Sequence, residues 1–370
     1  MAGERLSSLH VNTEVSWRGG EQQVLHLLEG LTRRGLRAEL AARPGCPLAE
    51  RAAAAGVAVH PLSMWGEWDL AAALRLAGIM RRGRFGILHL HTSHAHGLGR
   101  LASLAAGGAR VVVSRRVVFP VKGGIFGRLK YRSGIDKYIA ISYAIRDALV
   151  CAGVAAERVA VVPSGVDASR FDGLRPAALR AEFGLPAQSR LVGVVGHLAA
   201  SKGQQDFLAA AAIICEKFPD ARFLLVGEGE SLAALKRQAA ELGIDSRVVF
   251  TGFRTDVPAV LAGLDVFVMP SHAEGLCTAA IEAQMAGCAV VATDAGGLKE
   301  VVQDMQTGLA VSPGSPGALA EAICRLLADD SLRSRLGAAG RARAMEFFTV
   351  EKMVDGTRQV YECLAKTQVL

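Results

Sequence analysis

Two acidic residues lie eight positions apart in a stretch of otherwise small and apolar residues. The stretch PSHAEGLCTAAIEAQMAGCAVVATDAGG covers residues 270–297 and contains Glu274 and Glu282. Burying a carboxylate without a partner is costly, so each one needs a ligand, an internal partner or an exposed position. Because both carboxylate oxygens accept hydrogen bonds, such a group suits paired hydroxyls, for example those of a ribose. The alternative is structural, with one glutamate favoured by a helix dipole and the other on the surface.

Glycine turns follow several strand-like runs and add to this pattern. In VGVVGHLAASKGQQDFLAAA (192–211), a strand leads through a glycine turn into a helix that Ser201, Lys202 and Gly203 open. The positive charge of a lysine is unfavourable next to the positive N-terminal end of a helix. An anion bound between the lysine and the helix end would explain this arrangement. Similar turns occur at Gly19–Gly20, Gly227–Gly229 and Gly296–Gly297. Each could be only a tight turn, but together with the lysine and the two glutamates they indicate a diphosphate-bearing ligand.

Strand-like and helix-like runs alternate along the chain, which predicts two parallel α/β sheets with right-handed crossovers. We predict strands in residues 5–11, 36–42, 56–62, 85–91, 109–114 and 136–142, and then in 190–196, 221–227, 246–252, 264–270, 288–293 and 308–311. The segment 158–173 is rich in loop-forming residues and marks a boundary. We therefore expect two Rossmann-like domains, residues 1–166 and 167–348, with an amphipathic helix (349–370) packing back on the first. Ligands of such sheets bind at the carboxyl ends of the strands, here in a cleft between the domains.

The composition is that of a well-packed globular enzyme. The chain has 370 residues, 51% hydrophobic and 21% charged, and its seven cysteines form no CxxC pair. These features favour reduced thiols and a cytoplasmic location. The first residues lack the apolar core of a signal peptide, and no uncharged apolar run reaches about 18 residues, so we expect neither a signal peptide nor a membrane span.

Positive charge is concentrated in the first half. Residues 1–166 contain 22 Lys and Arg against 11 Asp and Glu, whereas the remainder has 20 against 24. A basic stretch covers residues 114–138 and includes Arg115, Arg116, Lys122, Arg128, Lys130 and Arg132. It could be a solvated helix, or a peripheral contact with the anionic inner face of the cytoplasmic membrane. The familiar signatures of nucleic-acid binding are absent, so we expect no nucleic-acid partner.

Taken in order, these motifs resemble those of the retaining GT-B glycosyltransferases of family 4, also called glycosyl transferases group 1. PSHAEGLCTAAIEAQMAG is similar to the family's E-x7-E signature, WRGGEQQ to its first glycine-rich loop, and ILHLHTSHAHG to its HxH strand end. GHLAASKG resembles its phosphate site, in which the usual arginine is replaced by His197. Single motifs are moderately specific, but the ordered set extends over nearly the whole chain.

The resemblance implies a role for each matching residue. The donor is a nucleotide-diphosphate sugar; Lys202 and His197 would neutralise its diphosphate, and Glu282 would bind its ribose. Glu274 would contact the donor sugar, and His91 the sugar near its anomeric carbon. The remaining donor-binding positions are Gly19, Gly20, Gly275, Leu276, Cys277 and Thr278. The implied reaction retains the anomeric configuration and transfers a hexosyl-type sugar to an envelope glycan, lipopolysaccharide or lipid-linked acceptor.

Alternatives remain open from the sequence. A GT-B nucleotide-sugar epimerase would share the same donor motifs, and a non-catalytic nucleotide-sugar binding module is a further option. His89, His91, His94 and His96 could form the metal centre of a hydrolase. The chain has no DxD-type motif where a nucleotide diphosphate would bind, so we expect a reaction without a metal or other cofactor. The sequence does not distinguish UDP, GDP and ADP donors.

Overall fold

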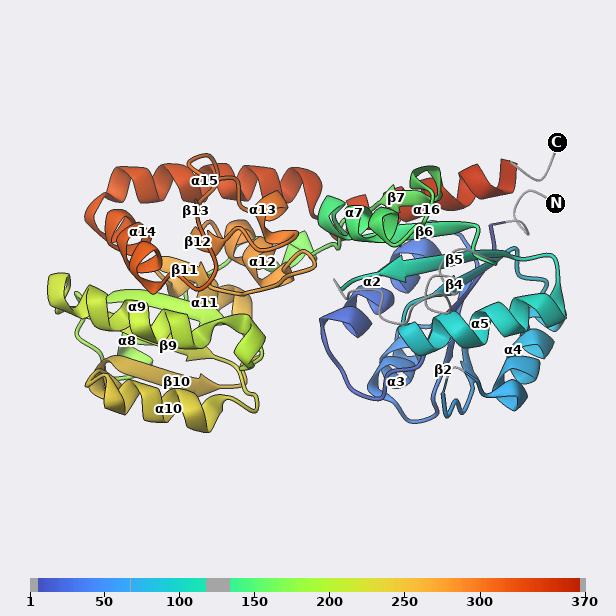
Figure 1. Ribbon diagram of the computed structural model, residues 1–370, viewed down its shortest axis with the longest axis horizontal. Helices are drawn as coiled ribbons and strands as arrows, with labels where there is room; N and C mark the ends of the chain where they lie inside the picture. The colour runs from blue at the N-terminus through green and yellow to red at the C-terminus, as the bar shows by residue number, and fades with distance from the viewer. Residues whose placement is uncertain (1–5, 67, 118–133, 367–370) are drawn as a thin grey trace. The chain divides into compact units, whose positions relative to one another are not determined.

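The computed structural model describes residues 6–66, 68–117 and 134–366 (Figure 1). Packing divides the chain into two compact units. The first unit consists of Met1–Gly165 with Val350–Leu370, and the second of Val166–Thr349. From sequence, the divisions were predicted after residues 166 and 348.

The first unit is built on a seven-stranded sheet in the order β3-β2-β1-β4-β5-β6-β7. All pairings between these strands are parallel. Its strands are β1 (Ser8–Asn12), β2 (Ala38–Ala42), β3 (Val59–Pro61), β4 (Ile87–Leu90), β5 (Arg110–Arg115), β6 (Lys137–Ala140) and β7 (Val159–Val161). Its helices are α2 (Gly19–Arg33), α3 (Pro47–Ala54), α4 (Leu70–Gly83), α5 (Ser93–Ala106), α7 (Tyr143–Cys151) and α16 (Val350–Lys366), with a 3₁₀ turn η1 (Ala156–Arg158).

The second unit repeats this plan with six parallel strands in the order β10-β9-β8-β11-β12-β13. The strands are β8 (Arg190–Val195), β9 (Ala221–Val226), β10 (Val248–Gly252), β11 (Val266–Met269), β12 (Ala289–Thr293) and β13 (Leu309–Val311). The helices are α8 (Leu179–Glu182), α9 (Gln204–Lys217), α10 (Leu232–Glu241), α11 (Val257–Gly263), α12 (Thr278–Met285), α13 (Leu298–Val301), α14 (Pro316–Ala328) and α15 (Asp330–Phe347). Short 3₁₀ turns are η2 (Ala168–Phe171), η3 (Ala200–Lys202) and η4 (Asp245–Arg247).

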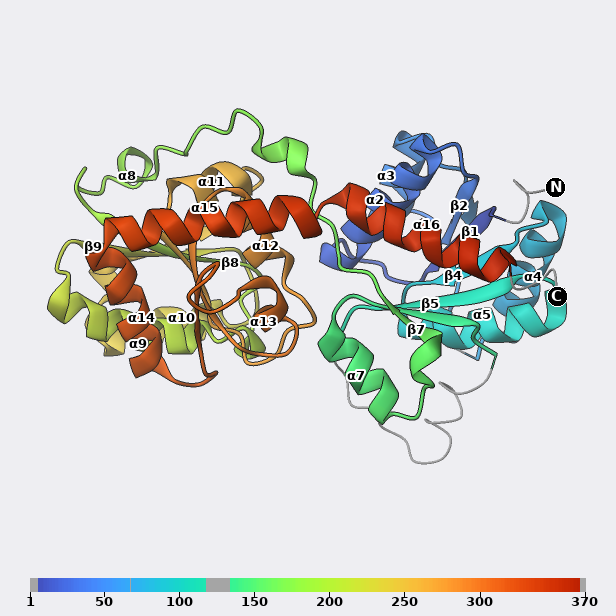
Figure 2. The same cartoon turned by 90° about the horizontal axis from the view of Figure 1, so that it is seen from above.

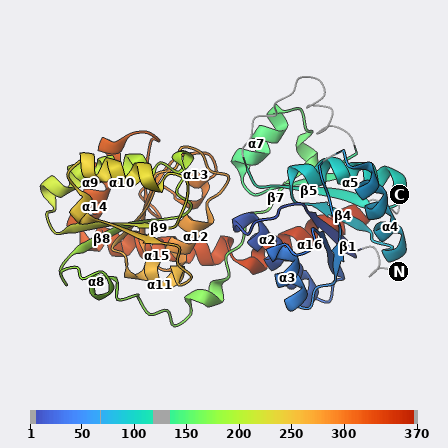
Figure 3. The same ribbon diagram turned by 90° about the horizontal axis from the view of Figure 1, so that it is seen from below.

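Helices cover both faces of each sheet, which explains why the central strands are buried along their whole length. In the first unit, α2, α3 and α16 share one core with the sheet, and α16 lies beside α2 (Figure 2). In the second unit, α9, α10 and α14 lie on one side of the sheet and α11 and α15 on the other (Figure 3). Lys202, Glu274 and His91, which are considered below, lie in the segments that follow strands, where helices leave the sheet edge open.

The predicted architecture of two Rossmann-like α/β domains is confirmed. In the structure the C-terminal helix α16 packs against α2 of the first unit. One element was missed: β7 lies in the segment 158–173, which the sequence indicated as loop. Pro163 and Gly165, which follow β7 closely, gave the whole segment the composition of a loop. None of the helices in the described part of the chain has both the length and the apolar character needed to cross a bilayer.

Candidate functional site

In the second unit, the order of strands reverses between β8 and β11, which are neighbours in the sheet. At such a reversal the loops that follow the two strands diverge and leave a crevice for a ligand. Lys202 lies in the loop after β8 and Glu274 in the loop after β11. The structure brings them together, and the Lys202 Nζ donates to Glu274 Oε1 at 2.6 Å. The two predicted catalytic residues of this unit therefore form one ion pair at the reversal.

Two further hydrogen bonds hold Glu274, and a third holds its partner Ser271. Ser271 Oγ donates to Glu274 Oε1 at 2.8 Å, and Thr293 Oγ1 donates to the Ser271 carbonyl at 2.6 Å. The Gly297 N–H donates to the Glu274 carbonyl at 3.0 Å, which joins the loops after β11 and β12. Sequence reasoning missed Ser271, although its position directly after a buried strand was a usable signal.

The electrostatics of this pair are those of a partly desolvated ion pair. Glu274 is 9% exposed and the Lys202 side chain 33%. Burial by itself would lower the pKa of Lys202, but the charge and hydrogen bond of Glu274, together with Cys277, raise it above its ordinary value. Lys202 is thus a permanent cation, held at a strand end with part of its surface open to an incoming anion.

A glycine lets the lysine loop approach β11 closely. Gly203 follows η3 with φ +70°, a left-handed conformation that favours glycine. A Cβ at this position would lie 1.9 Å from the Pro270 carbonyl oxygen. The His272 N–H also donates to the Ser201 carbonyl at 3.0 Å. The position of Lys202 therefore depends on contacts that only glycine permits.

The predicted donor-binding run Gly275–Thr278 forms the entry to α12. Cys277 is its N-cap, has φ +78°, and provides no side-chain cap for the first N–H groups of the helix. Burial, followed by the charge of Glu274, raises the pKa of the Cys277 thiol, which stays neutral. Leu276 is buried, so at this position only the backbone is available to a ligand. An uncapped helix start with a neutral N-cap is suited to accept an anion.

Glu282, predicted to bind a ribose, has an internal partner. Arg170 Nη1 in η2 donates to Glu282 Oε1 at 2.8 Å. Burial raises the pKa of Glu282, and the charge and hydrogen bond of Arg170 oppose that rise. Sequence reasoning missed Arg170, because 112 residues separate it from Glu282 and no local pattern connects them. No hydrogen bond within the described residues is assigned to the second oxygen, Oε2.

His197 lies in the same loop after β8 as Lys202. The Gln204 side chain donates to the His197 carbonyl at 3.0 Å and helps to hold this loop. Its Nε2 is 2.8 Å from Glu230 Oε2, and both side chains are exposed. The histidine therefore has an acidic neighbour at the position where the resemblance implies an arginine.

In the first unit, the strand order reverses between β1 and β4. Gly19 and Gly20 follow β1 and form the first turn of α2. Apart from the chain neighbours and the helix's own backbone, no atom of the described residues lies within 4 Å of the place that a Cβ would occupy. The Arg18 N–H donates to Glu21 Oε2 at 3.1 Å. The glycines thus leave open space around the positive end of a 15-residue helix.

His91 follows β4, on the other side of the same reversal, and contacts a histidine that the sequence analysis did not select. Its Nε2 is 2.9 Å from Nδ1 of His10 on β1. His10 Nε2 is in turn 3.0 Å from Ser8 Oγ. The neighbouring His89 contacts Tyr361 OH through Nδ1 at 2.6 Å and Ser114 Oγ through Nε2 at 2.8 Å.

These contacts change the predicted histidine cluster. Within the described residues, His10, His89 and His91 are the three whose ring nitrogens lie within 4.8 Å of one another. His94 is exposed, and His96 is buried against the Tyr138 ring at a centroid distance of 6.1 Å. Both nitrogens of His89 are already engaged by hydroxyl groups, so the local chemistry is a hydrogen-bond network between neutral imidazoles.

Only part of the predicted basic surface lies within the described residues. Arg115 ends β5, and Arg116 follows with its Nε enclosed. Burial lowers the pKa of Arg116 to about 10, and Glu21 opposes that change. Lys122, Arg128, Lys130 and Arg132 lie outside the described residues.

Comparisons with known families cover both units. The model described as Glycosyltransferase Family 4 matches residues 17–170, and the model described as Glycosyl transferases group 1 matches residues 177–343.

Curated relatives carry related names. A 2-deoxystreptamine glucosyltransferase of Streptomyces kanamyceticus is 38% identical over 183 residues, 48% of this chain and 47% of that protein. A D-inositol 3-phosphate glycosyltransferase of Corynebacterium jeikeium is 30% identical over 77% of this chain and 69% of its own length. The Escherichia coli UDP-Gal:alpha-D-GlcNAc-diphosphoundecaprenol alpha-1,3-galactosyltransferase is 27% identical over 79% of each chain. The chain spans 47% to 65% of the length of several relatives, among them the Streptomyces protein.

Solved structures share the fold. The Anabaena protein HepE, crystallised with UDP, superposes with a TM-score of 0.86 at 22% identity and covers 97% of this chain and 100% of its own. At this identity the likeness concerns the fold, which is the two-sheet GT-B architecture.

Proposed function

Because this chain belongs to the family 4 glycosyltransferases, we propose that it transfers a sugar from a nucleotide-diphosphate sugar to a hydroxyl group of an acceptor. The observation that carries the proposal is the Lys202–Glu274 pair at the strand reversal of the second unit. One cation and one carboxylate at a strand end suit a donor that is anionic at its diphosphate and rich in hydroxyls at its sugar.

The proposed chemistry follows from charge. Breaking the bond between the anomeric carbon and the diphosphate places negative charge on the leaving group and positive charge on the sugar. Lys202 and the uncapped N–H groups at the start of α12 would stabilise the leaving diphosphate, and Glu274 would bind the donor sugar. Preorganised donors aimed at developing charge are typically a large catalytic term, each about 10²–10³ in rate.

We further propose retention of the anomeric configuration, in line with the family resemblance. The leaving diphosphate would accept the proton of the acceptor hydroxyl on the face where the new bond forms. Since Lys202 and helix N-termini supply the positive charge that the diphosphate needs, we propose a reaction without a metal.

The donor nucleotide and the acceptor belong to the proposal as well. UDP-sugars are the first choice, because the Escherichia coli relative carries UDP-Gal in its name. That name also includes a lipid-linked acceptor, which supports the proposal of an envelope glycan, lipopolysaccharide or lipid-linked acceptor at the cytoplasmic side of the membrane.

The test is a donor screen followed by product analysis on the full chain. UDP-, GDP- and ADP-sugars are compared by the thermal stabilisation that each gives, which grows with ligand excess over Kd. The stabilising donor is then incubated with acceptors, and products are identified by mass spectrometry and by NMR of the anomeric proton. We expect an α-linked product from an α-linked donor.

Three results would reject the proposal. Release of a free monosaccharide epimerised at C2, without any need for an acceptor, would identify an epimerase. Stoichiometric metal with hydrolysis of the ligand would identify a hydrolase at His10, His89 and His91. Tight donor binding with no turnover, in wild type and Glu274→Ala alike, would identify a binding module.

A further inference from the structure

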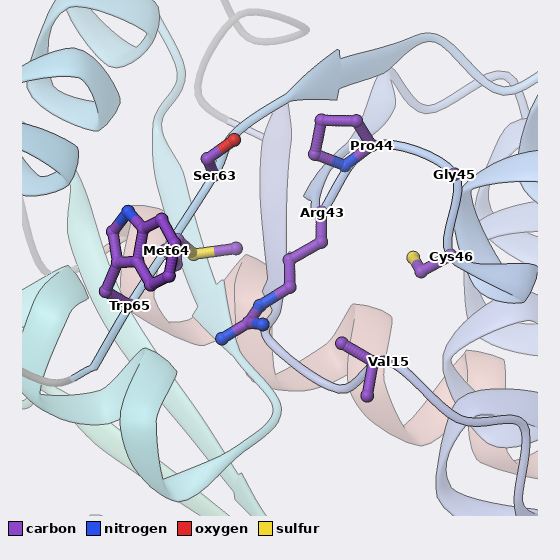
Figure 4. Close-up of a pocket in the computed structure, with 8 residues that line it drawn as sticks. All are labelled: Val15, Arg43, Pro44, Gly45, Cys46, Ser63, Met64 and Trp65. Atoms are coloured by element: carbon purple, nitrogen blue, oxygen red, sulfur yellow. The ribbon is translucent and has the colours of Figure 1, made fainter.

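A cavity of about 400 Å³ lies in the first unit at the carboxyl ends of three neighbouring strands. Val15 follows β1, residues 43–46 follow β2, and residues 63–65 follow β3 (Figure 4). None of the residues assigned to donor binding lines it. Its size is in the range of small-molecule pockets, about 300–1,000 Å³. The sheet edge is the one that carries His91, since β1 and β4 are neighbours.

The local sequence fixes the wall that carries Arg43. The four residues Arg43-Pro44-Gly45-Cys46 form a turn in which the Cys46 N–H donates to the Arg43 carbonyl at 3.4 Å. Proline at the second position and glycine with φ +70° at the third are the signature of a type II turn. Pro47 then begins α3 directly. Arg43 is thus presented from a turn with little conformational freedom.

The guanidinium of Arg43 has no counter-charge among the described residues. Its side chain extends between Met64 and Trp65 on one side and Val15 on the other (Figure 4). No hydrogen bond or ion pair joins it to the described part of the chain, and its Nε is enclosed without a partner. The residues that line the cavity include no acid. Arg43 is half-buried, and its enclosed Nε lacks the hydrogen bond that an anion in the cavity would supply.

An aromatic ring provides the opposite wall. Trp65 is 90% exposed, whereas the neighbouring Met64 is 3% exposed and anchors the loop in the protein interior. The Trp65 N–H donates to Asp69 Oδ2 at 3.2 Å, and Asp69 Oδ1 accepts the Ala72 N–H at the start of α4. The tryptophan is therefore held at a fixed backbone position with its apolar ring uncovered. An exposed tryptophan ring is a favourable binding surface for ligands that have an apolar face and a polar edge.

We propose that this cavity is an acceptor subsite for a phosphorylated polyol, with Arg43 binding the phosphate and Trp65 covering the face of the ring. The inference rests on the proposed glycosyltransferase function and, in place of the lipid-linked acceptor considered there, selects an acceptor with a free phosphomonoester. The planar fork of the guanidinium matches two phosphate oxygens, and the cavity has room for one ring and one phosphate. We commit to a phosphomonoester, because a monoester leaves two free oxygens for the fork and carries the greater charge.

The experiment is isothermal titration of the full chain with glucose 6-phosphate as the probe. Arg43→Gln should weaken binding about 10- to 100-fold, the effect of losing hydrogen bonds between charged groups. Arg43→Lys, which keeps the charge but loses the fork, should lie in between. Unphosphorylated glucose and glycerophosphoglycerol, the phosphodiester that remains when an anionic phospholipid loses its acyl chains, should both bind more weakly than the probe.

Two control variants make the result specific. Arg33→Gln removes an exposed arginine of α2 outside the cavity and should leave the affinity unchanged. Lys202→Ala removes the proposed donor phosphate site of the other unit and should also leave it unchanged. Thermal unfolding of each variant verifies the fold.

The inference is overturned if wild type does not bind glucose 6-phosphate, or if Arg43→Gln binds it as wild type does. It is also overturned if binding is lost in Lys202→Ala, because the probe would then occupy the donor site. Donor-sugar binding, measured in the same proteins, separates the two proposals. Intact donor binding without probe binding rejects the acceptor subsite alone, whereas absent donor binding rejects the proposed function.

Discussion

His10 Nδ1 and His91 Nε2 lie 2.9 Å apart, joining the central strand β1 to the loop after β4. Their rings are nearly parallel, with an interplanar angle of 9° and a centroid distance of 5.2 Å. Burial lowers the pKa of His10 to about 3, and burial followed by the two neighbouring histidines lowers the pKa of His91 well below its usual value. Both rings are therefore neutral at pH 7. One of the two bonded nitrogens must carry the proton and the other must accept it, so the tautomer of His10 determines the tautomer of His91.

His10 is therefore expected to act as a positioning residue for His91. The family resemblance implies that His91 contacts the donor sugar, and on that basis His10→Phe, which removes the hydrogen bond, should lower kcat by up to about 10²-fold, the cost of a misplaced group. His10→Asn, whose amide can take the place of Nδ1, should recover part of the loss. KM for the donor should change less than kcat in both. Steady-state kinetics measures this; equal kcat in the Phe and Asn variants would show that the hydrogen bond plays no part.

The buried neutral histidines predict acid sensitivity of the first unit. The pKa values of His10, His89 and His91 are lowered in the folded state. The unfolded chain therefore binds more protons below pH 6.5, and stability is lost as the pH falls from 6.5 toward the folded-state values. Each histidine contributes a slope of about 1.4 kcal/mol per pH unit. His10→Asn should reduce the total slope by that amount.

Urea unfolding between pH 7.5 and 4.5 measures these slopes. All three tryptophans, Trp17, Trp65 and Trp68, belong to the first unit, so their fluorescence reports its unfolding. The control is His94→Gln, which removes an exposed histidine and should leave the slope as in wild type. The same slope in His10→Asn and wild type would contradict a neutral His10.

Lys202 should matter for turnover much more than for the fold. Lys202→Ala should lower kcat by about 10²–10³, because the leaving diphosphate loses its cation. The substitution also leaves Glu274 without its ion-pair partner, so some stability is lost. Combining Lys202→Met with Glu274→Gln should recover stability without recovering turnover. Lys217→Ala, at an exposed position of α9, is the control and should leave both unchanged. Recovery of turnover in the double variant would show that the lysine acts only by stabilising the fold.

Arg170 should control the ionisation of Glu282. Because Arg170 opposes the rise that burial causes, Arg170→Gln should raise the pKa of Glu282 further. A protonated Glu282 no longer accepts a hydrogen bond at each of its two oxygens. Donor KM should therefore rise as the pH falls, and this rise should begin at a higher pH than in wild type. The measurement is donor KM from pH 5 to 8, with the exposed Arg175→Gln as control. A lower KM in Arg170→Gln at all pH values would mean that arginine competes with the donor.

Gly203 offers a test of the close loop packing beside Lys202. Gly203→Ala places a Cβ 1.9 Å from the Pro270 carbonyl oxygen, and its φ of +70° already disfavours alanine. Gly243→Ala is the matched control, because its φ is +67° and nothing lies within 4 Å of a Cβ there. Both substitutions should cost about 1–2 kcal/mol for the left-handed conformation, and Gly203→Ala should cost clearly more and also lower kcat. Thermal unfolding and kinetics measure both; equal losses in the two variants would contradict the clash.

The order of elements could be predicted from local sequence, because buried parallel strands and amphipathic helices impose their own periodicity on the chain. The same local reasoning selected Lys202, Glu274 and Glu282, since glycine turns and charges near strand ends are visible over short spans, whereas the role of His91 came from the family resemblance. The edge strand β7 was missed, because Pro163 and Gly165 directly after it gave its segment the composition of a loop.

The sequence by itself determined the two sheets, the loops that follow their strands and the kinds of side chain those loops carry. Only the tertiary structure decided the partners: Glu274 with Lys202, Glu282 with Arg170, and His91 with His10. These partners are 72, 112 and 81 residues apart, and they meet because neighbouring strands in a sheet need not be neighbours in the chain. The periodic sequence patterns that determine helices and strands extend over a few residues. Ion pairs and burial depend instead on which distant parts of the chain the folded structure brings together.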